Sequence, residues 1–314
     1  MTLTDRLMWR YLLALTVSAA AILCFAVLAS HLNAQERVYD WSKSRTLYPG
    51  IQYAHVAAEH PRRTVINCLR IDSQTPKLRF HATGRYLHWV DGKQETRRKT
   101  VRNFMRESQK TDRKLVVATN ADAFSPWPVP YQKETPTDVL GLLVSGGTLV
   151  SRGSGTPSFL VANSGELGIE ATVADRNVTD IQTAVSGFGL CLVDGQVPAS
   201  GNDQHPRTGL GLSADGRYLL MMTIDGRQPA SAGATTQAVG AWLKQFGAHT
   251  GINMDGGGST TMAWWDPLAP DEDKCRLLNS PVGNGRSYDS QKASPRFQSS
   301  ERANGSNLGV YFVK

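Results

Sequence analysis

Asn253-Met254-Asp255-Gly256-Gly257-Gly258-Ser259-Thr260-Thr261 places an acid and a run of three glycines at the end of a predicted strand, 250–254. Glycines permit positive φ values and let a ligand approach the backbone closely, and successive N–H groups in such a turn can bind an anion. The acid before them can act on a leaving group or coordinate a cation. A plain glycine-rich hairpin turn is the alternative, but the flanking acid and hydroxyls favour a functional site.

This stretch supplies the first candidate site residues. We expect Asp255 to be catalytic, and we expect the residues that follow it to bind substrate. No lysine follows the glycines, so the pattern is not that of a nucleotide-binding P-loop. The serine comes after the third glycine, which does not match the GxSxG elbow of many hydrolases. The expected substrate-binding residues here are Gly256, Gly257, Gly258, Ser259 and Thr260.

Short apolar runs separated by Gly, Asp and Asn lie on both sides of this stretch, a pattern typical of strands joined by tight turns. Asp-Gly turns predict hairpins within 190–197 and 209–224. Apolar residues at helical spacing predict helices at 100–110 and 235–247. Because strands outnumber helices and hairpins connect them, the sequence predicts an α+β fold, with a mixed, largely antiparallel sheet and few helices in a single domain.

A second group of polar residues lies around the hairpin at 209–224. Arg207 and Thr208 come directly before it, and Asp225 follows its second strand. A guanidinium fixed after a proline is suited to a bidentate contact with phosphate or carboxylate. Acids at two strand ends, Asp225 and Asp255, are what acid–base chemistry on a glycoside requires. A surface arginine and a turn-forming aspartate remain the alternatives.

A third group follows the predicted strand 114–119. Asn120 and Asp122 are suited to binding sugar hydroxyls, and Phe124 or Trp127 can form a stacking wall beside them. The prolines after Phe124 make such a wall rigid. Taken alone, the segment also fits an ordinary turn with buried aromatic residues.

The N-terminus is predicted to deliver the rest of the chain outside the cytoplasm. Arg6 and Arg10 precede an apolar run long enough to span a membrane, and polar sequence follows it. The run fits either a cleaved signal peptide or a signal anchor, which would make a membrane a partner of the protein. The predicted organisation is a cytoplasmic segment 1–10, the apolar helix 11–30, a linker 31–49 and a catalytic domain 50–314 with its motifs within 64–314.

The charge and the cysteines exclude several classes of protein. The 34 Lys and Arg residues outnumber the 27 Asp and Glu residues, giving a formal charge of +7, but they are scattered along the chain. We therefore expect no nucleic-acid partner. Three of the 4 cysteines, Cys68, Cys191 and Cys275, lie after the apolar run. Their spacing matches no zinc or redox motif and allows at most one disulfide.

The three groups, in this order and followed by Asn279-Ser280-Pro281 and Glu301-Arg302, resemble the phosphodiester glycosidase family. The resemblance extends from about residue 64 to the C-terminus, and its most specific part is 253–262. It implies a hydrolase that removes a sugar from a sugar-1-phosphate diester. In the family's first motif, paired aromatics follow two small residues, whereas here Asp122 and Ala123 leave only one aromatic residue. The resemblance implicates Asn120, Arg207, Thr208, Asp225, 255–261 and Arg302.

The expected function is hydrolysis of a glycosyl-1-phosphate diester, on an envelope or exopolysaccharide glycan, by a secreted or membrane-anchored enzyme. Two other functions stay open: noncatalytic binding of anionic glycans, and transfer or ligation of wall polymers. No cofactor is expected to be required. A calcium or other divalent cation site built from Asp225, Asp255 or the acidic run 271–273 is an alternative, and a solvated loop is the simpler interpretation of that run.

Overall fold

The computed structural model describes residues 38–60, 62–126, 133–283 and 300–314. The chain divides into two units, Met1–Val38 and Tyr39–Lys314, and the fold below is that of the second. The predicted membrane segment at 11–30 lies outside the described residues. Among the residues that are described, no helix is long and apolar enough to cross a membrane.

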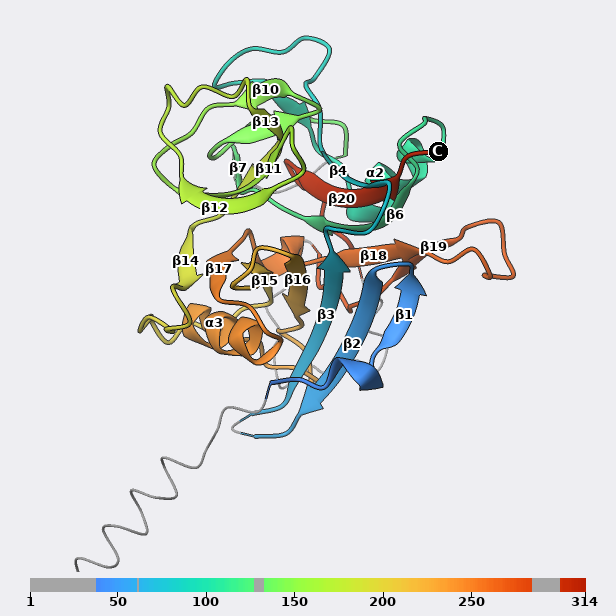
Figure 1. Cartoon of the computed structure of the whole chain (residues 1–314), viewed down its shortest axis with the longest axis vertical. Helices are drawn as coiled ribbons and strands as arrows, with labels where there is room; N and C mark the ends of the chain where they lie inside the picture. Colours follow the sequence, from blue (N-terminus) through green and yellow to red (C-terminus); the bar gives the residue numbers. More distant parts are fainter. Residues whose placement is uncertain (1–37, 61, 127–132, 284–299) are drawn as a thin grey trace, which may run out of the picture. The chain divides into compact units, whose positions relative to one another are not determined.

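A seven-stranded sheet forms one layer of the second unit (Figure 1). All its neighbouring strands pair antiparallel. The apolar run in its central strand is buried on both faces, since Leu219 and Met221 enter one hydrophobic cluster while Leu220 and Met222 enter another. Its strands, in order across the sheet, are β1 (Arg45–Tyr48), β2 (Ile51–Ala58), β3 (Thr64–Asp72), β16 (Tyr218–Ile224), β15 (Arg207–Leu212), β17 (Thr250–Asn253) and β14 (Gly189–Leu192).

The described residues also form two five-stranded sheets and a three-stranded sheet, again with antiparallel pairing between named strands. One sheet contains β10 (Thr148–Ser151), β9 (Leu143–Ser145), β13 (Ile181–Ser186), β11 (Pro157–Ala162) and β12 (Leu167–Ala171). The next contains β19 (Cys275–Leu277), β18 (Met262–Trp265), β6 (Leu115–Asn120), β20 (Asn307–Phe312) and β4 (Leu78–Ala82). The smallest contains β5 (Thr96–Arg97), β8 (Pro136–Val139) and β7 (Phe124–Ser125).

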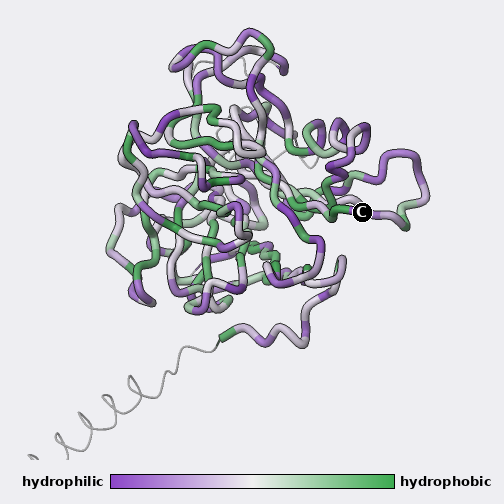
Figure 2. The backbone as a smooth tube through the Cα atoms, turned by 45° about the horizontal axis from the view of Figure 1, so that its top comes forward, coloured by the Kyte–Doolittle hydropathy of each residue, from purple (hydrophilic) through white to green (hydrophobic). Residues whose placement is uncertain are grey.

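The main hydrophobic core lies where the three larger sheets meet. It joins Leu69 and Met221 of the seven-stranded sheet to Val117 of β6 and Phe159 of β11. In the backbone tube coloured by hydropathy, many of the outer loops are hydrophilic, and hydrophobic stretches run through the interior (Figure 2). Strand ends that are far apart in the sequence therefore meet around this core.

Two α-helices cover outer faces of these sheets. Helix α2 (Val101–Ser108) is capped by the Thr100 hydroxyl, and α3 (Thr236–Gln245) is capped by the Thr235 hydroxyl. Helix α3 packs closely on the seven-stranded sheet because that sheet carries a glycine beneath it: a Cβ on Gly209 would lie 2.8 Å from Val239 Cγ1. The predicted α+β class, largely antiparallel and with few helices in one domain, is confirmed.

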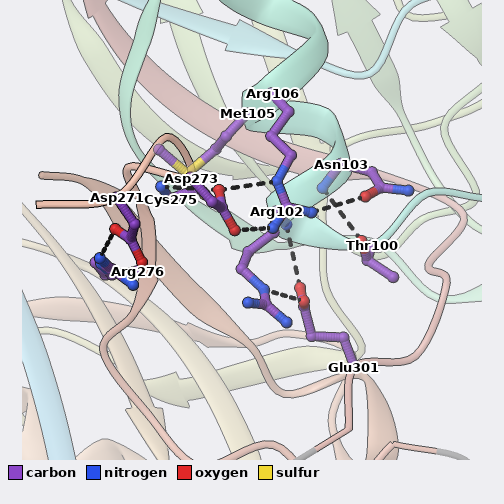
Figure 3. Close-up of polar contacts among 10 residues, drawn as sticks. All are labelled: Thr100, Arg102, Asn103, Met105, Arg106, Asp271, Asp273, Cys275, Arg276 and Glu301. Carbon is purple, nitrogen blue, oxygen red and sulfur yellow. Dashed lines mark hydrogen bonds and ion pairs between the residues drawn. The ribbon is translucent and has the colours of Figure 1, made fainter. Parts of the chain in front are cut away.

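Helix α2 also holds two segments that follow β18 (Figure 3). Arg106 pairs with Asp273, next to β19, with 3.1 Å between Arg106 Nε and Asp273 Oδ1. Arg102 pairs with Glu301, whose carboxylate also accepts a hydrogen bond of 3.1 Å from the Arg102 amide. The Glu301 side chain is only 5% exposed, so this ion pair fixes the backbone beside Arg302.

The folded unit begins inside the stretch predicted as a linker, 31–49. Trp41 is buried against Phe246 at the end of α3, and its indole donates a 3.0 Å hydrogen bond to the Phe246 carbonyl. Strand β1 adds an edge to the sheet. The polar composition of 31–49 predicted a linker, because one buried aromatic residue and a short edge strand produce no periodic hydrophobic pattern. The cysteines Cys68, Cys191 and Cys275 are buried free thiols.

Candidate functional site

Asn120, the last residue of β6, connects three of the predicted groups. Its Oδ1 accepts hydrogen bonds from the Thr208 hydroxyl at 2.8 Å and from the Thr261 amide at 3.0 Å. Its Nδ2 donates to the Asp255 carbonyl at 2.7 Å. Asn120 is 1% exposed. Both ends of its amide are therefore committed to holding the beginning of β15 and the glycine turn together.

Asp255 lies two residues after the end of β17, and only Gly256 separates it from the 3₁₀ turn η2 (Gly257–Ser259). It is 2% exposed. Its Oδ1 accepts a 2.9 Å hydrogen bond from the Gly256 amide, while Oδ2 makes no hydrogen bond of ordinary geometry to a described residue. Burial raises the pKa of Asp255 to about 6, and the Ser259 hydroxyl and the Arg302 charge oppose that rise. A carboxyl with this pKa can exchange a proton near neutral pH.

The glycine turn uses its amides differently from the sequence-based expectation. The Gly256 amide donates to Asp255, and the Gly257 amide donates to the Pro206 carbonyl at 2.8 Å. These two N–H groups are therefore occupied inside the protein. The glycines instead let other groups approach the turn closely.

Three arginines come close to the turn at successive glycines. Ideal Cβ positions show this: a Cβ on Gly256 would lie 3.8 Å from Arg207 Cδ, and one on Gly257 would lie 3.4 Å from Arg227 Nη2. At Gly258 the Arg302 Nη2 would be 2.4 Å away. The guanidinium groups of Arg227 and Arg302 lie at the turn, and Arg207 approaches it through Cδ, so positive charge there comes from side chains. Such groups bind phosphate in bidentate geometry.

Each arginine is held by further contacts. Arg207 Nε donates to the Ala234 carbonyl and Nη2 to the Asp203 carbonyl, both at 2.9 Å. Burial lowers the pKa of Arg207, and the Arg227 charge adds to that effect. Arg227 Nη2 lies 3.1 Å from His205 Nδ1. Arg302 Nη1 donates to the Ser259 hydroxyl at 3.4 Å. Fixed like charges of this kind create a local site for an anion.

Gly258→Ala should destabilise the protein by about 3 kcal/mol, the upper end of the cost of overpacking a core. The new Cβ would lie 1.9 Å from the Gly283 carbonyl oxygen, which belongs to backbone and cannot rotate away. Urea unfolding measures the change in free energy. Gly168→Ala is the matched control, because Gly168, like Gly258, has no positive φ, and a Cβ there would meet nothing within 4 Å. Equal costs for both variants would contradict close packing at Gly258.

Asp225 follows β16 and is 4% exposed. Its Oδ1 accepts hydrogen bonds from Asn279 Nδ2 at 2.9 Å and from the Ser280 amide at 3.1 Å. Burial raises the pKa of Asp225 to about 6, and the bonds from Asn279 and Ser280 oppose the rise. Asn279 Nδ2 also lies 3.2 Å from the Thr260 carbonyl. A single side chain therefore links Asp225 to the glycine turn.

Asp122 is fully buried and lies behind the glycine turn. The Ser186 amide donates to its Oδ1 at 2.5 Å, and the Ser306 hydroxyl donates to its Oδ2. Burial raises the pKa of Asp122 to about 8, and the Asp255 charge contributes to the rise, although the two serines oppose it. These contacts give Asp122 a structural role between β6, β13 and the segment before β20.

Asp122→Asn should make the protein more stable than wild type at alkaline pH and equally stable near pH 4. The folded pKa of about 8 lies above the unfolded value of about 4, so the stability from this group is complete below pH 4. It is lost as pH rises through 8, by up to about 1.4 kcal/mol per pH unit. Asparagine stays neutral at every pH. Urea unfolding of both proteins from pH 4 to 9 measures the difference, and parallel curves would contradict the shifted pKa.

The sequence analysis missed Arg227, Asn279 and Ser280 as contributors to the site. Arg227 adopts φ 57°, a left-handed conformation that is uncommon for a residue with a side chain and occurs often at functional sites. Its place after Asp225-Gly226 was the available signal. Asn279 and Ser280 belong to a motif that was noted only for its order in the chain, since their contacts with Asp225 depend on how β18 and β19 turn back.

The described residues include no group of three or more His, Cys, Asp or Glu side chains arranged to hold a metal ion. In the acidic run 271–273, Asp271 pairs with Arg276 and Asp273 pairs with Arg106 (Figure 3). These carboxylates are thus engaged by arginines.

The sequence model of the phosphodiester glycosidase family matches residues 113–305, which is more than half of the chain. The chain belongs to the phosphodiester glycosidase family. The match includes Asn120, Arg207, Arg227, Asp255 and Arg302, the residues that meet at the glycine turn. The resemblance inferred from the motifs is confirmed.

Solved structures share the phosphodiester glycosidase fold of this chain. The catalytic domain of zebrafish N-acetylglucosamine-1-phosphodiester alpha-N-acetylglucosaminidase, auto-inhibited by its pro-peptide, aligns with a TM-score of 0.58 and 18% identity. That alignment covers 88% of this chain and 86% of the zebrafish chain. A hypothetical protein from Synechocystis aligns with a TM-score of 0.52 and 12% identity, covering 86% of this chain and 63% of the other. No curated protein sequence matches this chain.

Proposed function

We propose that this family member hydrolyses a glycosyl-1-phosphate diester and releases the sugar. One observation carries the proposal: a buried carboxyl, Asp255, lies in a glycine turn surrounded by Arg207, Arg227 and Arg302. The guanidinium groups match the charge of a phosphodiester, and the carboxyl provides acid–base chemistry next to it. The name of the zebrafish enzyme describes hydrolysis of the same class of bond.

The chemistry depends mainly on fixed charge. The group that leaves the sugar is a phosphate monoester, which is a stable anion, so its departure needs less acid assistance than that of an alkoxide. Preorganised donors around the phosphate stabilise the charge that develops as the bond to the sugar breaks. Above its pKa of about 6, Asp255 is ionised and can accept a proton from the attacking water. Asp225 is the second acid of the site.

The substrate is proposed to be a phosphorylated glycan outside the cytoplasm. Support for this location comes from the N-terminal sequence, in which Arg6 and Arg10 precede the apolar run 11–30. Such a segment either directs secretion or anchors the enzyme beside envelope polymers. The formal charge of +7 favours association with anionic glycans.

The test is an assay of the purified full-length protein on a panel of sugar-1-phosphate diesters in ¹⁸O-labelled water. Release of sugar that carries the label shows cleavage between the sugar carbon and oxygen, as proposed. Label in the phosphate product would show cleavage at phosphorus and would refute the glycosidase mechanism. Binding without any product would favour a noncatalytic glycan-binding protein.

A further inference from the structure

A cavity of about 330 Å³ lies beside Asp225, next to the glycine turn but lined by other residues. Its wall contains polar groups that the proposed hydrolysis does not use, together with apolar surface from Leu278. This size is at the lower end of the range for small-molecule sites, about 300–1,000 Å³, and suits one sugar ring better than an oligosaccharide. The polar residues in its wall include His55, Asn67, Asp225, Gln228 and Ser280.

A row of polar side chains on one face of the seven-stranded sheet connects this cavity to the glycine turn. His55 of β2 is directly opposite Asn67 of β3, which is opposite Thr223 of β16. Thr223 is in turn opposite Thr208 of β15, whose hydroxyl donates to Asn120 at 2.8 Å. Residues directly opposite one another on antiparallel strands have their side chains on the same face. The cavity and the turn are therefore parts of one polar surface.

Asn67 is the decisive group in the cavity wall. It is 1% exposed, and its Oδ1 accepts hydrogen bonds from Tyr53 Oη at 2.7 Å and from His55 Nδ1 at 2.9 Å. Its Nδ2 has no hydrogen-bond partner among the described residues. If the Asn67 amide were rotated by half a turn, its nitrogen would face Tyr53 and His55, and its oxygen would then be the atom without a partner. A buried polar atom without a partner is costly, which indicates that a ligand group pairs with it.

The negative charge in the cavity wall favours the neutral sugar ring of a glycosyl phosphate over its phosphate group. Its wall carries the Asp225 carboxylate and contains no arginine or lysine among the described residues. A carboxylate accepts hydrogen bonds from sugar hydroxyls but repels phosphate. Asn279 joins the cavity to the glycine turn, since its Nδ2 is 2.9 Å from Asp225 Oδ1 and 3.2 Å from the Thr260 carbonyl. The cavity therefore adjoins the turn that the arginines approach, as a sugar ring joined directly to its phosphate requires.

We propose that this cavity is the subsite for the sugar ring and that His55 and Asn67 determine which hydroxyl pattern it accepts. The Asn67 amide pairs with one ring hydroxyl, and Asp225 accepts a hydrogen bond from another. His55 and Asn67 lie outside the family match at 113–305. The inference rests on the proposed function for the position of the phosphate.

Calorimetric binding to the full chain tests the subsite without requiring turnover. The probes are a panel of hexose 1-phosphates, their monodeoxy analogues and inorganic phosphate. We expect His55→Ala and Asn67→Leu each to weaken binding of the preferred hexose 1-phosphate about 10-fold, the effect of one lost hydrogen bond. Binding of inorganic phosphate should not change, because it requires only the arginines. A deoxy analogue that lacks the recognised hydroxyl should bind wild type and Asn67→Leu equally.

The controls separate a lost contact from a damaged fold. His88→Ala removes an exposed histidine from the loop after β4 and should bind every probe like wild type. His55 is also exposed, so His55→Ala provides the test even if the buried Asn67→Leu fails to fold. Two results would overturn the subsite. One is that wild type binds every hexose 1-phosphate no more tightly than inorganic phosphate. The other is that His55→Ala loses the same factor of affinity for both probes. Failure to hydrolyse any diester, with the binding results intact, would refute the proposed hydrolysis alone.

Discussion

Asp255→Asn should lower kcat on a glycosyl-1-phosphate diester about 10³-fold, within the range for loss of a general acid or base, with little change in KM. Asparagine keeps the shape of the residue, and its oxygen can still accept the 2.9 Å hydrogen bond from the Gly256 amide. Only the ability to take up a proton is lost. Steady-state release of free sugar by the purified variant measures the effect. Full activity in a folded variant would remove Asp255 from the mechanism.

The pH profile distinguishes Asp255 from Asp225, because burial raises the pKa of each carboxyl to about 6. If ionised Asp255 accepts the proton, kcat/KM of wild type rises with pH through about 6. The residual activity of Asp255→Asn should then lack this rise, whereas Asp225→Asn should retain it. Asp112→Asn, at an exposed acid, is the matched control and should behave like wild type. A rise that persists without Asp255 would assign the titration to another group.

The local elements of this fold could be predicted from the sequence because their signals are local. Val239 and Leu243 at helical spacing predicted a helix at 235–247, close to the observed α3, and Asp-Gly turns predicted the hairpin between β15 and β16. The order of strands could not be predicted. Strand β17 pairs with both β15 and β14, and β6 lies between β18 and β20. These pairings join segments far apart in the chain, and no local pattern encodes them.

The same distinction applies to the site. Asn120, Thr208 and Asp225 lie at or next to strand ends, and antiparallel pairing brings such ends together, as with Gly209 opposite Asn253. Composition indicated that the turn would bind an anion, but it could not show that the Gly257 amide is occupied by the Pro206 carbonyl. Nor could it show that the side-chain oxygen and nitrogen of Asn120 both form hydrogen bonds with other protein groups. Which groups form these hydrogen bonds depends on the direction of each backbone and side-chain group, which the sequence does not reveal.

The position of Arg227 leads to the second large effect. Arg227→Gln should lower kcat/KM on a diester about 10²- to 10³-fold, the cost of removing one preorganised donor from a developing charge. It should also weaken inhibition by inorganic phosphate. Arg227→Lys keeps the charge but loses the planar pair of donors, so it should restore only part of the activity. Inhibition constants and kcat/KM for both variants measure these differences.

The left-handed backbone of Arg227, φ 57°, gives this prediction its physical basis. Such a conformation costs about 1–3 kcal/mol and persists when the surrounding structure imposes it. Here it places a guanidinium near Gly257 and within 3.1 Å of His205 Nδ1. Arg176→Gln is the control, since Arg176 forms ion pairs with Glu170 of β12 and with Asp180, next to β13. If Arg227→Gln bound phosphate and turned over the diester as well as Arg176→Gln, the strained arginine would serve the fold, and Arg207 and Arg302 alone would carry the phosphate.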